Sequence, residues 1–169
     1  MRVGIVVFAI WIAVSFVAGR RRHPADEHIM LTVHLVEVLS ERIQELNEAD
    51  RAVLIRELRV AGPKSPNGSN QVLLSFLKSR GMLEDAFSSY TGSVLPNGRP
   101  EFHDAFGRPL IVASSETQRV LVSLGDDPFE VTVPDVDGYD VLIWSVGLDG
   151  VNQSGTNDDI NNWRLAQND

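Results

Sequence analysis

Apolar residues fill the first part of the chain almost without interruption. Residues 3–19 carry no charged side chain. This length is near the lower limit for a helix that crosses a hydrocarbon core of ~30 Å. The run predicts a retained membrane anchor over 1–23, and a signal peptide that is later removed is the alternative. A basic flank follows the run directly, at Arg20, Arg21 and Arg22.

The pattern then becomes helical. From 26 to 61, apolar residues recur three and four positions apart, which places one apolar stripe along a helix. The members of the stripe are Val36, Leu39, Ile43, Leu46, Val53, Leu54 and Leu58. The stripe falters at Asp50, and Asn47 is a good N-cap at this interruption, so the pattern fits one long helix or two. Residues 24–62 are therefore predicted to form a helical spine.

A loop and a short helix come next. Residues 61–70 are dense in glycine, proline, serine and asparagine, which is typical of loops. Asn70 fits the N-cap of a helix that runs through Arg80. Gly81 fits the position just after the end of that helix.

Strand-like runs occupy much of the remaining chain. They are Leu110–Ser114, Arg119–Leu124 and Tyr139–Val146. The acidic connection over 125–138 is long enough to hold a further edge strand. Helices followed by strands predict an α+β fold, with the spine packed on a small antiparallel sheet. We expect 63–169 to form this α+β domain.

Charge and residue types exclude several classes of function. The formal net charge of −8 argues against nucleic acid as a partner, because phosphate binding requires a basic face. The chain has no cysteine, so disulfides and thiolate metal sites are excluded. We find no nucleophile or phosphate-binding motif, and we predict that the protein is not an enzyme. A hydrolase built on Asp126, Asp127 or Asp137 is a weaker alternative without a motif.

An oxygen-rich loop follows the last predicted strand. Its carboxylates and neutral oxygens come from Asp149, Asn152, Gln153, Ser154, Thr156, Asn157, Asp158 and Asp159. Calcium takes about six to eight hard oxygen ligands and accepts such a mixture. The loop has no histidine, which disfavours zinc and copper. Ordinary turn chemistry, with the aspartates capping a short helix, is the other interpretation.

Two segments carry a resemblance to a known family. The first is "YDVLIWSVGLDG", a loop and then "NDDINNW", and the second is "HDAFGRPLIV", His103 to Val112. The first resembles the C-terminal motif of the major pseudopilins of type II secretion systems. The second resembles the segment that precedes the first strand of that family, with Ala105 and Phe106 in place of proline and tryptophan. The similarity spans 71–163, and the interval 114–138 is longer here and unlike the family.

The resemblance implies a calcium ion in the C-terminal loop. Its ligands would be side-chain oxygens and main-chain carbonyls, from Val146, Asp149, Thr156, Asp158 and Asp159. The resemblance also implies a structural protein that assembles with other pseudopilin-like subunits or with copies of itself. The expected location is the inner membrane, with a single span at the N-terminus and the body in the periplasm or otherwise outside the cytoplasm.

The N-terminus departs from the family. It lacks both the glycine-phenylalanine-threonine cleavage junction and the glutamate within the apolar helix. These absences favour the alternative of an anchored calcium-binding domain that does not polymerise. The basic flank at 20–22 would hold the body in the cytoplasm by the positive-inside rule. A calcium loop favours an exported body instead, because free calcium in the cytoplasm is low.

Overall fold

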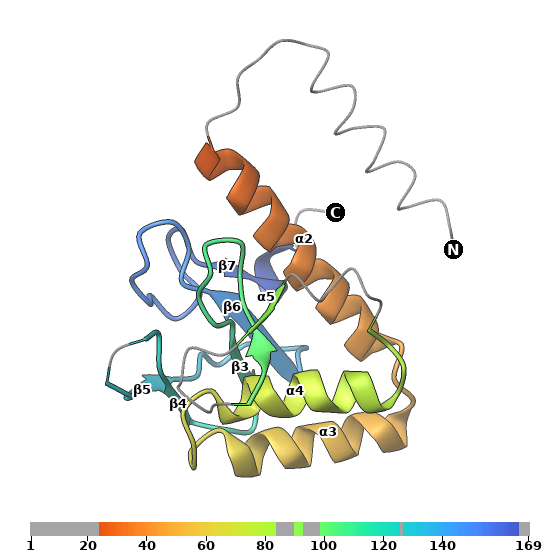
Figure 1. Ribbon diagram of the computed structural model, residues 1–169. Helices are drawn as coiled ribbons and strands as arrows, with labels where there is room; N and C mark the ends of the chain where they lie inside the picture. The colour runs from red at the N-terminus through yellow and green to blue at the C-terminus, as the bar shows by residue number, and fades with distance from the viewer. Residues whose placement is uncertain (1–23, 84–89, 93–98, 126, 166–169) are drawn as a thin grey trace, which may run out of the picture.

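The longer helices come first, the strands follow, and a short helix comes last (Figure 1). The computed structural model describes residues 24–83, 90–92, 99–125 and 127–165. The helices are α2 (Pro24–Gln44), α3 (Glu48–Ala61), α4 (Gly68–Ser79) and the short α5 (Asn162–Leu165). The strands are β1 (Thr91–Gly92), β2 (Glu101–Phe102), β3 (Ile111–Ser114), β4 (Arg119–Val122), β5 (Phe129–Thr132), β6 (Val141–Ser145) and β7 (Ile160–Asn161). This order confirms the predicted α+β class.

The predicted anchor over 1–23 lies outside the described residues. Within the part of the chain that the structure describes, no helix is both long enough and apolar enough to cross a membrane. α2 contacts β6 and β7, which confirms that the first part of the spine packs on the sheet.

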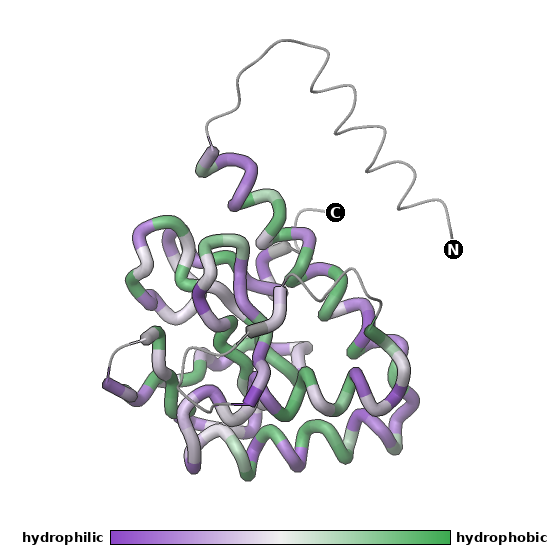
Figure 2. Tube along the Cα trace, in the orientation of Figure 1, coloured by the Kyte–Doolittle hydropathy of each residue, from purple (hydrophilic) through white to green (hydrophobic). Residues whose placement is uncertain are grey.

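The spine consists of two helices, which settles the alternative that the sequence left open. The Asp50 N–H donates to Asn47 Oδ1 at 2.9 Å, so Asn47 caps α3. The apolar stripe is buried on both sides of the break, for example at Leu39 and Leu58. Figure 2 shows apolar and polar positions alternating along α2 and α3. Beyond the break the chain changes direction, and α3 lies side by side with α4 (Figure 1).

The prediction that Asn70 caps the next helix is wrong. α4 begins at Gly68, and Asn67 takes the N-cap position with a left-handed φ of 55°. The Asn70 side chain instead donates to the carbonyls of Phe102 and Leu110, at 2.8 and 2.7 Å, and accepts the Phe102 N–H at 2.7 Å. It is buried between helix and strands, where its amide satisfies main-chain groups that water does not reach. The prediction for Gly81 is confirmed, since it follows the helix with a φ of 65°.

Three strands form the central sheet. The order is β3-β6-β7, and both pairings are antiparallel. β4 and β5 form a separate hairpin, and β5 is the edge strand predicted within 125–138. β1 and β2 make a third, two-stranded pairing.

β6 is a partition between two apolar cores. Its residues alternate in direction, as in any strand, and every one of them is buried. Val141 and Ile143 face the helical core, which is formed with the buried residues of α2, α3 and α4. Leu142 and Trp144 face the hairpin core, which includes the buried valines of β4 and β5. Burial on both faces explains why the sequence here is apolar without alternation.

Candidate metal centre between β6 and β7

The oxygen-rich loop joins two neighbouring antiparallel strands. Trp144 of β6 lies opposite Asn161 of β7, so both ends of the loop are fixed by the sheet. The rings of Trp144 and Trp163 meet edge to face, with centroids 5.8 Å apart. A side chain at Gly155 would overlap the Trp163 ring, so the loop backbone lies directly on this tryptophan. The indole N–H of Trp144 donates to Asn152 Oδ1 at 3.0 Å and ties the loop to the hairpin core.

Asp158 holds the first turn of the loop. Its Oδ2 accepts the N–H groups of Leu148 and Asp149, at 2.8 and 3.0 Å. Gly147 lies against the main chain of Asp158 with a φ of 62°, and no Cβ fits there. The Asp158 side chain thus joins the two ends of the loop.

Asp159 is the buried carboxylate of the loop, with 5% of its surface exposed. Its Oδ2 accepts the N–H groups of Gln153 and Gly155, at 3.0 and 2.8 Å. Its Oδ1 is buried and has no hydrogen-bond partner. Burial raises the pKa of the Asp159 carboxyl, and the charges of Asp158 and Asp149 act in the same direction, against the two N–H groups. A buried carboxylate oxygen without a partner is costly, and a cation would satisfy it.

Asp149 and Thr156 complete the predicted carboxylate and carbonyl set. Asp149 Oδ1 accepts the Val151 N–H at 2.7 Å, and its Oδ2 accepts from Gln153 Nε2 at 3.0 Å. The Thr156 carbonyl accepts the Asp159 N–H at 3.0 Å. Val146 is buried at the end of the β6 run, in the hairpin core.

The three carboxylates share one loop but do not form a ready-made cage. Among the residues that the structure describes, no three His, Cys, Asp or Glu side chains converge well enough to hold a metal ion. The donor set nevertheless fits calcium, which accepts carboxylate, amide and carbonyl oxygens together. Two oxygens in the loop, Asp159 Oδ1 and Gln153 Oε1, are buried without a hydrogen-bond partner. The aspartates do not cap a helix, because β7 follows them directly.

A second segment supports the loop from outside. Asp104 is buried, and its Oδ2 accepts the Ser145 hydroxyl at 2.6 Å. Its Oδ1 accepts the N–H of Arg108 at 2.9 Å. Arg108 then donates through Nη1 to the Gly147 carbonyl at 2.8 Å. The sequence indicated the 103–112 segment only through its resemblance to the family, and no local pattern tied it to the loop.

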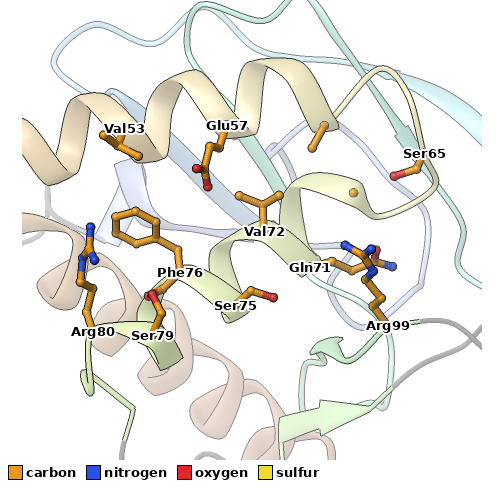
Figure 3. A pocket seen from close by; sticks show the side chains of 12 residues that line it. Val53, Glu57, Ser65, Gln71, Val72, Ser75, Phe76, Ser79, Arg80 and Arg99 are labelled. Atoms are coloured by element: carbon orange, nitrogen blue, oxygen red, sulfur yellow. The ribbon is translucent and has the colours of Figure 1, made fainter.

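A groove of about 480 Å³ lies between α3 and α4 (Figure 3). Arg80 and Arg99 lie at its two ends, and Arg80 pairs with Asp50 at 2.5 Å. The described lining includes one carboxylate, that of Glu57, and no histidine, so these residues offer no acid–base pair. Of the acids named for a hydrolase, Asp126 lies outside the described residues, and Asp127 and Asp137 are exposed and do not line this groove.

Comparison with known proteins gives no relative. No family model, curated protein or solved structure matches the chain. The chemistry of the β6–β7 loop is therefore the basis for a functional proposal.

Proposed function

We propose that the protein is a non-enzymatic, pseudopilin-like structural component of a type II secretion or pilus-like assembly. A calcium ion in the β6–β7 loop stabilises its C-terminal part. Asp149, Asp158 and Asp159 supply side-chain oxygens to the ion, and Val146 and Thr156 supply carbonyls. The N-terminal segment holds the chain in the inner membrane, with the body in the periplasm.

One observation carries the calcium proposal. Asp159 is buried with an oxygen that accepts no hydrogen bond, inside a loop that holds two further carboxylates. Without a cation these carboxylates repel one another, whereas a bound cation would attract all of them. The resemblance in the C-terminal motif supports the wider assignment to an assembly.

Thermal unfolding of the full-length chain in detergent tests calcium binding. The ligand stabilises the folded state by ~2.7 kcal/mol when its concentration is a hundredfold its Kd. We expect a higher Tm with calcium than with a chelator, together with a change in tryptophan fluorescence, because Trp144 and Trp163 flank the loop. Asp158→Ala and Asp159→Ala should abolish the difference.

Asp135→Ala is the matched control, since Asp135 is an exposed aspartate outside the loop. It should keep the full calcium response. A wild-type chain with the same Tm in calcium and in chelator would overturn the calcium proposal.

The alternative function is an anchored calcium-binding domain that does not polymerise. The observation that favours it is that the apolar run over 3–19 contains no glutamate, a residue that the family carries within its apolar helix. N-terminal sequencing of the membrane-extracted protein separates the two functions. An intact Met1 end supports the alternative, whereas a processed end and cross-linked multimers support assembly.

A further inference from the structure

We propose that Gln153 is a further calcium ligand, through its side-chain oxygen Oε1. This inference rests on the proposed calcium site and goes beyond the five ligands assigned from the resemblance. Oε1 is buried and accepts no hydrogen bond. It and Asp159 Oδ1 are the two side-chain oxygens of the loop that are buried without a hydrogen-bond partner.

The hydrogen bonds of Gln153 place it between two of the carboxylates. Its Nε2 donates to Asp149 Oδ2 at 3.0 Å, and its main-chain N–H donates to Asp159 Oδ2 at 3.0 Å. Its carbonyl accepts the Thr156 hydroxyl at 2.7 Å. One residue thus contacts three of the five proposed ligand residues, and its side-chain oxygen is the acceptor left over.

A neutral amide oxygen suits the coordination chemistry of calcium. The carboxylates do not converge as a group of three, so aspartates alone do not enclose an ion. Calcium sites commonly include amide oxygens beside carboxylates, and amides add a ligand without adding repulsion. The same side chain donates a hydrogen bond to Asp149, which stabilises that carboxylate when no ion is bound.

Terbium luminescence and calcium titration test this assignment in the full-length chain in detergent. Terbium replaces calcium in oxygen sites and is excited through nearby tryptophans, here Trp144 and Trp163. Its decay in light and heavy water counts the water molecules on the ion. We expect Gln153→Ala to weaken calcium binding about tenfold and to add about one bound water, because solvent replaces the lost ligand.

Two further variants sharpen the test. Gln153→Glu keeps an oxygen in reach and adds a charge, so it should bind calcium at least as tightly as the wild type without the extra water. Gln118→Ala is the control, because Gln118 is an exposed glutamine outside the loop, and it should change neither quantity. The Tm in chelator shows that each variant is folded.

The outcomes separate the inference from the proposed function. If the wild type binds neither calcium nor terbium, both fail. If the wild type binds, Asp159→Ala does not bind and Gln153→Ala behaves as wild type, only the assignment of Gln153 is overturned. Weaker binding by Gln153→Ala with no added water also overturns it, since Gln153 would then only position Asp149.

Discussion

The helical core and the β6–β7 loop are stabilised in opposite ways. The helical core buries leucines almost completely, including Leu39, Leu54, Leu58 and Leu77. Its stability comes from apolar area removed from water, which needs no ion. The loop buries a carboxylate instead and holds itself with hydrogen bonds from main-chain N–H groups to aspartates. The helical core therefore needs no ion for its stability, whereas the proposed calcium ion would add a partner for the buried Asp159 carboxylate of the loop.

Truncation of the helical core should give the largest effect. Leu58 of α3 is fully buried, and Leu58→Ala should lower the free energy of unfolding by about 2–5 kcal/mol. Denaturant titrations with calcium and with a chelator should show the same loss in both. Val60→Ala is the control on the same helix, because Val60 is 49% exposed, and it should cost little. Loss of the calcium response in Leu58→Ala would contradict the independence of the two regions.

Gly155→Ala should damage the loop alone. The backbone has a φ of 77° and the new Cβ overlaps the Trp163 ring, so we expect a cost of about 2 kcal/mol or more. Calcium should no longer raise the Tm, as differential scanning calorimetry would show. Gly138→Ala is the matched control, since its φ is 84° but nothing lies within 4 Å of the added carbon. Equal effects of the two variants would exclude the packing of Gly155 on Trp163 as the cause.

Without calcium, the stability of the folded protein should depend on pH through the Asp159 carboxyl. Burial raises the pKa of its carboxyl in the folded state, so folding takes up a proton. The chelated protein should therefore lose stability as pH rises from the ordinary aspartate pKa through the raised value. Calcium competes with this proton, so its stabilising effect should grow over the same interval.

Tm values of wild type and Asp159→Asn, measured against pH in chelator, check this prediction. The difference between their slopes isolates Asp159 from the other acids. Parallel curves for the two proteins would contradict the assignment of the pH dependence to Asp159. Asp135→Asn should follow the wild type, as an exposed carboxyl outside the loop.

A surface ion pair should give the smallest effect. Arg59 of α3 pairs with Glu116 at 2.9 Å, and both side chains are more than half exposed. Exposed pairs of this kind contribute about 0.2–1 kcal/mol, so Glu116→Gln should fall at the low end of that range. Denaturant titration at low and high salt is the measurement, and high salt should remove the difference. A loss of unfolding free energy as large as that of Leu58→Ala would contradict the description of this pair as a weak surface interaction.

Periodicity predicted most of the elements, because it is a local property. The stripe through Leu39 and Leu58 and the strands near 111–114 and 141–145 follow from short-range patterns, whereas the edge strand within 125–138 was expected only from the length of that connection. Asn70 was mistaken for a cap because its partners, Phe102 and Leu110, are far along the chain. Tertiary hydrogen bonds outweighed its local preference.

For the candidate site, too, the sequence predicts the local features and misses those that depend on distant contacts. The acidic loop was visible in the sequence, because its residues are close together in the chain. The support of the loop by Asp104 and Arg108 was not visible in the sequence, because these contacts join residues about forty positions apart. The special place of Gln153 was also hidden, since its neighbours in the chain offer the same kinds of oxygen. What distinguishes Gln153 is that its Oε1 is buried without a hydrogen-bond partner, whereas Asn152 Oδ1 accepts two hydrogen bonds.

The partition made by β6 has a consequence for changes in chain length. Adjacent residues of β6 face different cores, so a shift of the strand by one position would exchange their side chains and disrupt both. The pairing of Trp144 with Asn161 fixes the strand on each side of the loop. Added or removed residues between these strands would therefore alter the loop and leave the register intact, at a small entropic cost. We therefore expect the length of this loop to vary more easily than the length of β6 itself.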